Sequence, residues 1–504
     1  MGYSTWQQGF VQAAVADGCP AKTLGPQQRL ALSVQALAGE QSITALAEEH
    51  HVSRKFVYQQ AATAQSALAD AFDRSTAADE RVLFELPVTR SWLRQVVLGL
   101  TLIGHSSYRG VSEFCRDLLD VSVSVGTVHN IVRDAVETAR VHNRGQDLAA
   151  VDMAGLDEIF QNGRPVLVVA DIASSYCCLL SPEEHRDADT WGVRLLELQD
   201  RGWAPRATIA DFGTGLRAGQ KLALPEVPCR GDVFHVLQEI TQLVTSLENR
   251  AYDALSTQQR CERQQARARR RGQRTHRLTR RSTAARQAAT RAVDLADEVV
   301  VLAGWLRRDI FAVSGLAYAD RGTLLDFVRS ELQNRLASCA RLKPLCVVLK
   351  NHRDELLAFA AQLDHDRQHL AESFEVAPAL VAALLDLEAL DPRQPQRWQQ
   401  EAVLRRQLGQ RFYPLRAAVQ DLAAHTVRAS SVVENLNSRL RSYFFLRRHL
   451  GPDYLTLLQF FLNHRRFPRS RHAERVHHSP AELLTGQAHP HWLAMLGYTP
   501  FSRN

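Results

Sequence analysis

Sequence typical of β-strands is confined to one part of this 504-residue chain, between about residue 150 and residue 235. There AGLDEIF, the turn QNGRP and the apolar run VLVVADIASSYCCLL predict adjacent strands of an antiparallel hairpin or meander. A Leu-rich helix, TWGVRLLELQDRG, precedes a short buried strand that ends at Asp211 in TIADFGTG, and another strand is predicted near PCRGDVF. We therefore expect an α/β core with a mixed sheet whose strands come early in the core sequence.

The sequence that follows this core is predicted to be helical. From His235 to about Ala424 nearly every segment favours helices, and the α/β pattern does not resume. We expect this stretch to be a large all-α insertion. A capped amphipathic helix in RASSVVENLNSRLRSYFFLRRHLG, with Ser430 or Ser431 near its start, then returns to the sheet. The tail after it is basic and partly irregular.

The helical region in front of the sheet has the pattern of a helix-turn-helix. In SITALAEEHHVSRKFVYQQ the predicted inward positions are Ile43, Leu46, Ala47, Val52 and Val57. Long polar side chains on the outer face of the second helix can meet base edges and phosphates in a major groove. The candidate DNA-binding residues are Ser53 as the helix cap, Arg54, Lys55, Tyr58 and Gln59. An ordinary helical hairpin is the alternative interpretation.

A second segment repeats this logic in YRGVSEFCRDLLDVSVSVGTVHNIVRDAVETA. An apolar-faced helix, a short turn and a second helix from near Ser124 are predicted, with Thr127, His129 and Asn130 facing outward. A helical bundle that only connects the front of the protein to its core explains the pattern nearly as well.

Composition favours some partners and argues against some sites. The chain has 61 Lys+Arg against 54 Asp+Glu, a net charge of +7, which suits phosphate binding without proving it. Its eight cysteines include no CxxC pair and no zinc-type spacing, so we expect neither a structural zinc nor a disulfide framework. The first residues, MGYSTWQQGFVQAAVADG, lack the flank and apolar core of a signal peptide, and no window is apolar enough for a membrane span. A soluble, cytoplasmic protein that does not bind membranes is expected.

Three acids occupy positions that are poor for an acid unless it has a partner. Asp157 lies mid-strand in AGLDEIF, Asp211 ends a buried strand, and Glu434 lies in the first turns of the helix SSVVENLNSRL. A charge in or beside a buried strand is costly unless it is paired, hydrogen-bonded or bound to metal. Carboxylate oxygens on rigid elements are the ligands that Mg²⁺ prefers, and two such ions promote phosphoryl transfer. Any one of these acids alone would more often be a capped or salt-bridged carboxylate.

Taken in order, these residues resemble bacterial insertion-sequence transposases of the DDE class. The first acid of that group matches Leu156-Asp157-Glu158-Ile159, the second matches TIADFGTGLRAG, and the third matches the Ser-x-x-Glu-x-x-Asn-like run from Ser431 to Asn437. The resemblance implies an RNase H-like catalytic core interrupted by a helical insertion. It also implies that Asp157, Asp211 and Glu434 are the catalytic and metal-binding residues, with two Mg²⁺ or Mn²⁺ ions as cofactor.

Other acids near these motifs leave alternatives open. Asp152 and Asp171 also qualify for the first position, and Asp157 is preferred for its context in the first strand. Asp232 and His235 match a further motif of this group, for which a supporting role is preferred over direct metal ligation. Glu158 is expected to face solvent.

A dense basic run predicts another contact with DNA. Acidic residues that would pair with it are nearly absent, and one helical face could neutralise several phosphates. The run begins with Arg267, Arg269, Arg270 and Arg271, and continues through Arg274, Arg277, Arg280 and Arg281. A solvated helix or loop is the alternative. Trp305 in the following helix is more simply a core residue than a platform for an unpaired base.

The sequence thus predicts five regions. They are a helix-turn-helix domain at 1–75, a second helical region at 76–148, the first part of the catalytic core at 149–238, the insertion at 239–424, and the last part of the core with a basic tail at 425–504. The predicted function is metal-dependent cleavage and joining of double-stranded DNA at transposon ends and target, by a homodimer or higher oligomer associated with the bacterial nucleoid. A non-catalytic DNA-binding descendant, or a nuclease of the same fold that cuts without joining, would share many of these features.

Overall fold

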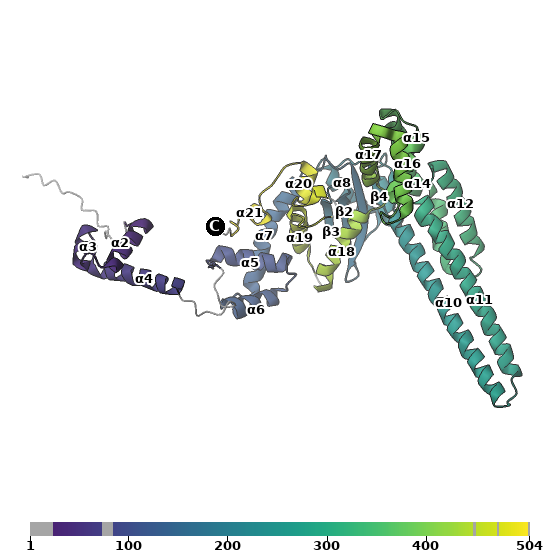
Figure 1. Cartoon of the computed structure of the whole chain (residues 1–504), viewed down its shortest axis with the longest axis horizontal. Coiled ribbons are helices and arrows are strands. Elements are labelled where there is room, and N and C mark those ends of the chain that lie inside the picture. Colours follow the sequence, from purple (N-terminus) through teal and green to yellow (C-terminus); the bar gives the residue numbers. More distant parts are fainter. Residues whose placement is uncertain (1–23, 73–83, 447–449, 471–472, 502–504) are drawn as a thin grey trace, which may run out of the picture. The chain divides into compact units, whose positions relative to one another are not determined.

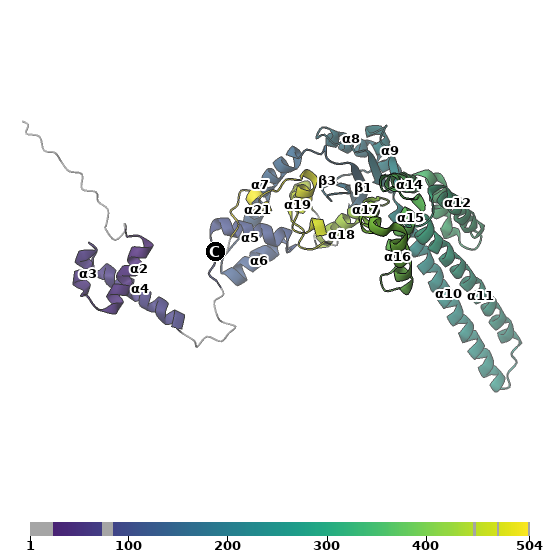
Figure 2. The same cartoon turned by 45° about the horizontal axis from the view of Figure 1, so that its top comes forward.

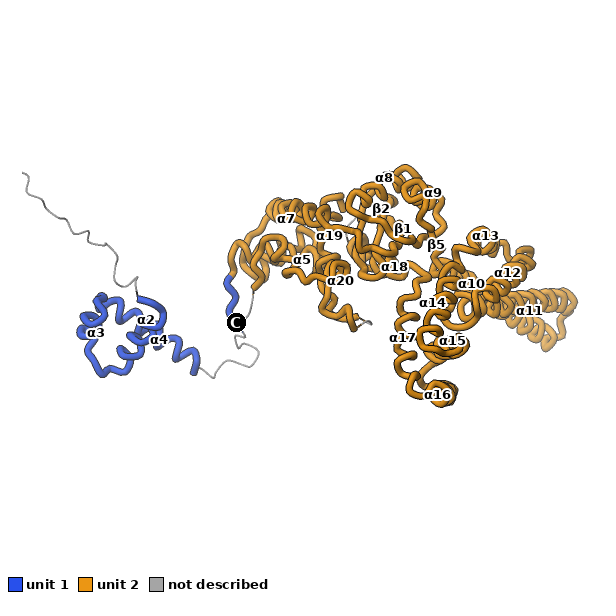
Figure 3. Tube along the Cα trace, turned by 90° about the horizontal axis from the view of Figure 1, so that it is seen from above, with its two compact units in different colours: residues 1–87 blue, residues 88–504 orange. Residues whose placement is uncertain are grey.

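The computed structural model describes residues 24–72, 84–446, 450–470 and 473–501. The first 18 residues, considered above for targeting, lie outside these ranges. The chain divides into two compact units, Met1–Pro87 and Val88–Asn504, which are coloured separately in Figure 3. It is mostly helical with one mixed sheet, and no helix in the described ranges combines the length and the apolar character needed to cross a bilayer.

In the first unit, the described residues form the helices α2 (Pro26–Ala38), α3 (Ile43–Glu49) and α4 (Arg54–Phe72). Serine side chains fix two of the helix starts, since Ser42 Oγ accepts from Ala45 N at 3.2 Å and Ser53 Oγ accepts from Phe56 N at 3.2 Å. The small core contains all five of the predicted inward residues. Those are Leu46, Ala47 and Val57, which are buried, and Ile43 and Val52, which pack against them.

Three helices open the second unit: α5 (Arg90–Leu102), α6 (Tyr108–Leu119) and α7 (Val125–Gly145). Ser107 caps α6 by accepting from Gly110 N at 3.0 Å, and Ser124 caps α7 by accepting from Thr127 N at 3.0 Å. The predicted start of a helix near Ser124 is therefore correct. These helices share a hydrophobic core with one face of the sheet.

The sheet has five strands in the order β3-β2-β1-β4-β5. Their bounds are β1 Met153–Gln161, β2 Arg164–Asp171, β3 Cys177–Pro182, β4 Ala207–Ala210 and β5 Cys229–Gly231. The first three form the expected antiparallel meander, whereas β4 and β5 run parallel to β1. Asn162 and Gly163, with φ of 50° and 82°, make the tight turn between β1 and β2, where both residues need a positive φ.

Helices cover both faces of the sheet (Figures 1 and 2). Leu167 and Val169 share a core with α8 (Ala188–Gln199) and α9 (Thr214–Ala223). Val166 and Val168 share the other core with α18 (Ser431–Leu446) and α19 (Pro452–His464). Helix α18 lies so close to β1 that a Cβ on Gly155 would meet Val433 Cγ2 at 2.4 Å. Because side chains alternate along a strand, Asp157 also faces α18.

Between β5 and α18 the structure is helical. This segment contains α10 (Val233–Arg270), α11 (His276–Trp305), a π-turn (Leu306–Ile310), α12 (Tyr318–Asn334), a 3₁₀ turn (Ala340–Leu342), α13 (Lys343–Asn351), α14 (Arg353–Ser373), α15 (Pro378–Ala389), α16 (Pro395–Leu408), a second 3₁₀ turn (Gly409–Arg411) and α17 (Phe412–His425). Helices α10 and α11 lie side by side as a long antiparallel hairpin whose far end stands clear of the other insertion helices (Figures 1 and 2).

Trp305 ends α11 and packs against the insertion core, 5.7 Å from the Phe327 ring. The chain closes with a 3₁₀ turn (Ala473–Arg475), α20 (Pro480–Thr485) and α21 (Trp492–Met495).

Candidate functional site

Three side chains from distant parts of the sequence meet beside the sheet. Asp157 lies on β1, His235 in the first turn of α10 and Glu434 in the first turn of α18. One ligand atom of each residue, two carboxylate oxygens and an imidazole nitrogen, lies within 4.8 Å of the other two. The structure therefore brings two of the three predicted catalytic acids together, with the predicted supporting histidine as the third member.

Asp157 has the most strained electrostatic environment of this group. The residue is only 6% exposed. Its carboxylate accepts hydrogen bonds from Glu158 N at 2.7 Å and from Asn437 Nδ2 at 2.6 Å. The pKa of Asp157 is raised to about 7, chiefly by burial and also by the nearby carboxylates of Glu434 and Asp211, while the Glu158 N–H and His235 act in the opposite direction. A cation at this position would offset the cost of ionising Asp157.

Asp232 fixes the starts of α10 and α18 relative to each other. This fully buried residue is the N-cap of α10, and its carboxylate accepts from Phe234 N at 2.7 Å. It also accepts from Ser430 N at 3.3 Å and from the Ser430 hydroxyl. Since Ser430 immediately precedes α18, one carboxylate ties together the two helices that carry His235 and Glu434. We call this contact the Asp232–Ser430 link.

His235 lies between two carboxylates without a hydrogen bond to either. Its Nε2 is 3.5 Å from Glu434 Oε1 and 3.7 Å from Asp232 Oδ2. This nitrogen is buried and has no hydrogen-bond partner among the described residues. In the amino-acid sequence, His235 is indicated by its spacing from Asp232. The Asp-x-x-His spacing puts both residues at the start of one helix.

Asp211 lies next to this group but is not part of it. It directly follows β4, and the parallel register pairs Leu156 with Ala210, so Asp211 follows at the position alongside Asp157. Its Oδ1 accepts from Gly213 N at 3.0 Å at the start of α9. Its charge contributes to the raised pKa of Asp157, which places the two carboxylates in one electrostatic environment.

The two alternative candidates for the first acid have other partners. Asp152 is exposed and forms a bidentate pair with Arg206, at 3.2 and 2.9 Å. Asp171 is buried and accepts from the backbone N and the hydroxyl of Ser174, at 2.7 and 2.5 Å. These contacts account for both carboxylates as parts of the local structure.

The expectation that Glu158 faces solvent is wrong. Its side chain is only 10% exposed, and it accepts from Arg186 Nη1 at 2.8 Å and from Trp191 Nε1 at 3.0 Å. Helix α8 covers this face of β1, so the residue next to Asp157 points into a second packed layer rather than into water.

The donor set at the meeting point fits a divalent cation. Two carboxylates and an imidazole offer hard oxygen ligands and one nitrogen ligand, and Asp211 adds a further carboxylate alongside. The unpartnered His235 Nε2 and the raised pKa of Asp157 both show polar groups that the protein alone leaves incompletely compensated.

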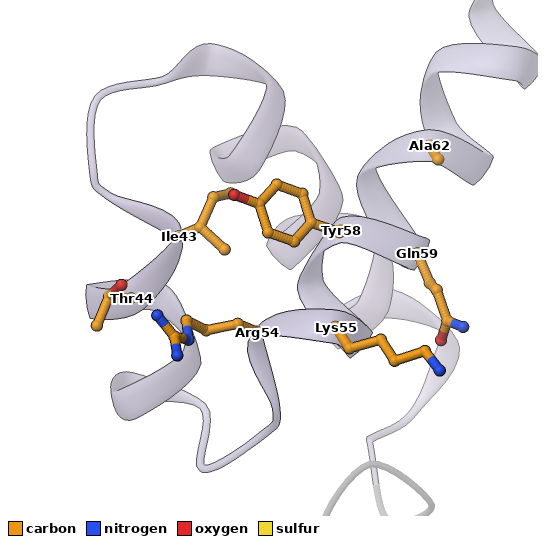
Figure 4. A pocket seen from close by; sticks show the side chains of 7 residues that line it. All are labelled: Ile43, Thr44, Arg54, Lys55, Tyr58, Gln59 and Ala62. Atoms are coloured by element: carbon orange, nitrogen blue, oxygen red, sulfur yellow. The ribbon is translucent and has the colours of Figure 1, made fainter.

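The outer face of α4 in the first unit is polar and shallowly hollowed. A groove of about 620 Å³ is lined by Ile43, Thr44, Arg54, Lys55, Tyr58, Gln59 and Ala62. Figure 4 shows Arg54 pointing toward Thr44, Tyr58 beside Ile43, and Lys55 and Gln59 extending together from the helix. All of the predicted DNA-binding residues in this region, including Ser53, are exposed. Thr44 is a further groove residue that the sequence pattern did not single out.

The arginine run falls at the far end of the α10–α11 hairpin. Helix α10 ends at Arg270, and α11 begins at His276. The exposed arginines around this tip, none of which forms an ion pair within the described part of the chain, are Arg267, Arg269, Arg270, Arg271, Arg274, Arg277, Arg280 and Arg281. In the second helical region, Thr127, His129 and Asn130 on α7 are exposed as well.

Comparisons with known proteins give little independent information about this chain. No protein-family model matches it, and no curated protein matches it. Among solved structures it is similar to the Drosophila P element transposase strand transfer complex, with 10% identity, coverage of 84% of this chain and 96% of that chain, and a TM-score of 0.25. A TM-score this low does not establish a shared fold, so function has to be inferred from the chemistry of the site.

Proposed function

We propose that this protein is a DDE-type DNA transposase with an RNase H-like catalytic core. The observation that supports this most is the convergence of Asp157, His235 and Glu434, with Asp211 alongside, although the insertion separates Glu434 from the other three residues in sequence. Asp157 is buried and Glu434 and Asp211 are half-buried, so placing their like charges together on rigid elements is costly, and a bound cation would offset that cost.

In this proposal Asp157, Asp211 and Glu434 hold divalent metal, either Mg²⁺ or Mn²⁺, as two ions. When bound, such ions lower the pKa of an attacking water or 3′ hydroxyl and offset charge on the phosphorus. The Asn437 amide and the Glu158 N–H orient the Asp157 carboxylate. The Asp232–Ser430 link holds Glu434 and His235 in place. Water then cuts the strand at a transposon end, and the freed 3′ hydroxyl attacks target DNA without a covalent enzyme intermediate.

DNA recognition is assigned to two surfaces. The α4 groove, with Ser53, Arg54, Lys55, Tyr58 and Gln59, is proposed to form a helix-turn-helix that reads base edges. The hairpin tip, with Arg267, Arg269, Arg270 and Arg271, is proposed to bind phosphates. Two DNA ends must be held together during joining, so we propose a homodimer or higher oligomer on DNA.

Metal binding and DNA nicking test this proposal together. Wild type should bind Mn²⁺ in a calorimetric titration and nick supercoiled plasmid in Mg²⁺, whereas Asp157→Asn and Glu434→Gln should lose at least about 100-fold in nicking, because about 3 kcal/mol of transition-state stabilisation is removed. Asp152→Asn is the matched control, since Asp152 is exposed and paired with Arg206. Folded, DNA-binding Asp157→Asn and Glu434→Gln proteins that nick at the wild-type rate would refute the proposal.

Joining distinguishes the transposase from a nuclease of the same fold. Labelled DNA from the flanks of the coding region, supplied with a free 3′ hydroxyl, should become covalently attached to plasmid. Nicking without such products would identify a nuclease, and DNA binding without either reaction would identify a non-catalytic DNA-binding protein.

A further inference from the structure

A second cavity lies beside the candidate metal centre, and its charge has the opposite sign. It has a volume of about 880 Å³ and is lined by residues from the first turns of α10 and α18, together with residues 423–424, 426–429, 467, 469–470 and 475. Phe234, the neighbour of His235, and Asn435, the neighbour of Glu434, both line it. The same two helices therefore present carboxylates and imidazole on one side and this cavity on the other.

The charged side chains that line the cavity are all arginines. They are Arg428, Arg439, Arg469 and Arg475, and no described residue of the lining is Asp or Glu. Asp232 and Glu434, which adjoin the lining residues Val233 and Asn435 in sequence, are engaged elsewhere, because Asp232 is fully buried against Ser430 and Glu434 belongs to the metal group. Four guanidinium groups without a carboxylate among them favour an anionic occupant.

Arg439 is the residue that most needs such an occupant. Its Nε is buried and has no hydrogen-bond partner among the described residues. Burial lowers the pKa of Arg439, and the guanidinium lies 6.0 Å from the centroid of the Phe467 ring. A buried N–H without an acceptor is destabilising, so an acceptor supplied by a ligand would bind favourably at this position.

Two of the other arginines are held in position by the backbone. Arg475 donates to Ala173 O at 2.7 Å and to Ser175 Oγ at 3.1 Å, and Arg428 donates to Phe311 O. Each guanidinium has five N–H donors, so these contacts orient the groups while leaving donors for a ligand. Arg469 is exposed at the mouth. Fixed donors bind an anion with less entropic cost than mobile ones.

The uncharged part of the wall combines polar residues, among them Thr426, Ser431 and Asn435, with a set of apolar side chains, which favours an anion that also has a weakly polar surface. Ile172, Leu237, Val313, Val432 and Phe467 line the cavity along with the arginines. An inorganic anion alone would leave these surfaces unused, whereas a nucleotide has both a phosphate and a flat, weakly polar base. The volume also lies within the range of about 300–1,000 Å³ that is typical of small-molecule sites.

We propose that this cavity binds one nucleotide of the DNA strand that passes the carboxylates, with its phosphate on Arg439 and Arg469 and its base against the apolar wall. This assignment rests on the proposed function, because a strand held at Glu434 would lie next to the cavity lined by Asn435. The cavity would then hold the strand in register with the metal centre without contacting the metal.

Binding without metal tests the cavity separately from catalysis. In EDTA, a short 5′-phosphorylated single-stranded oligonucleotide should bind about 10-fold more weakly to Arg469→Gln and to Arg439→Gln than to wild type, as expected for the loss of one charged hydrogen-bonding partner. Arg469 is exposed, so its replacement does not threaten folding. Arg335→Gln is the matched control, because Arg335 is already neutralised by Glu298 and Glu331, each at 2.7 Å.

Four results would overturn the proposal. If both cavity variants bind the oligonucleotide as tightly as wild type, the cavity is not its binding site. If Arg335→Gln loses as much affinity as the cavity variants, the loss reflects overall charge and not the cavity. If free thymidine monophosphate competes with the same affinity as the oligonucleotide, the cavity is a site for a free nucleotide. If inorganic phosphate competes equally well, the cavity is a site for an anion alone. Unaltered nicking by Asp157→Asn would refute the catalytic proposal while these binding results stood, so the two failures can be told apart.

Discussion

Replacing Asp157 with Asn should stabilise the metal-free protein, and the gain should grow with pH. The pKa of Asp157 is raised from 3.8 to about 7 in the folded state, chiefly by burial. A raised pKa means that folding favours the protonated acid, so the contribution of this group is fully present below about pH 4 and is lost as pH rises to about 7. At 1.36 kcal/mol per unit, the ionised carboxylate costs the folded state up to about 4 kcal/mol above that pH.

The amide introduced by Asp157→Asn removes this cost while keeping the hydrogen bonds available. Its oxygen can accept from Glu158 N as the carboxylate does. Its NH₂ can donate to Asn437 Oδ1, which has no partner among the described residues, once the Asn437 amide turns over. Relative to wild type, we expect a gain of about 2 kcal/mol near pH 5 and about 4 kcal/mol near pH 8.

Urea denaturation in EDTA, followed by tryptophan fluorescence, measures this gain. Trp191 and Trp203 are buried in the core that includes one face of the sheet, so their emission reports on the unfolding of this region. Added Mn²⁺ should reverse the order of stability, because it stabilises the protein that binds it more tightly. Asp152→Asn is the control and should show no pH-dependent gain. A gain for Asp157→Asn that is absent near pH 8, or equal at both pH values, would refute the reasoning.

Three further outcomes are expected. Gly155→Ala should lower the free energy of unfolding by about 1–3 kcal/mol and weaken Mn²⁺ binding, because the added Cβ would meet Val433 Cγ2 at 2.4 Å and push α18 away from β1. An unchanged affinity for Mn²⁺ in calorimetry would contradict this. Ser430→Ala should cost about 1–3 kcal/mol in urea denaturation by removing a donor to buried Asp232, and an unaltered midpoint would be inconsistent with the link. Neutralising four tip arginines should reduce the slope of log affinity for duplex DNA against log salt by about 3–4, measured by fluorescence anisotropy, and an equal slope would exclude phosphate contact there. The four arginines to be changed to Gln are Arg267, Arg269, Arg270 and Arg271.

Local chemistry made part of the site predictable from sequence. An acid next to Ile209 and Ala210 in a buried strand is costly, which singled out Asp211, and the strand context of Asp157 was equally visible. The turn at Asn162 and Gly163 separates the first two strands in sequence as it does in space. These features depend only on residues that are neighbours in sequence. The periodicity of apolar residues and the residue types at turns were therefore sufficient to predict them.

Features that depend on packing were not accessible in this way. His235 joins Asp157 and Glu434 only because Asp232 and Ser430, 198 positions apart, bond to each other. The burial of Glu158 depends on α8 covering the second face of β1, which no local pattern reveals. Arg439 is one basic residue among many in the sequence, and its importance arises from the cavity around it.

The Asp232–Ser430 link has a consequence for how such a protein can change. The link joins the two ends of the helical insertion to each other, so the insertion leaves the core and returns to it at one place. Helices α10 and α11 can then be lengthened or shortened together by whole turns without breaking the Asp232–Ser430 hydrogen bond. The insertion can also be replaced by a different one in the same way. The length of the α10–α11 hairpin and the geometry of the carboxylates can therefore change independently.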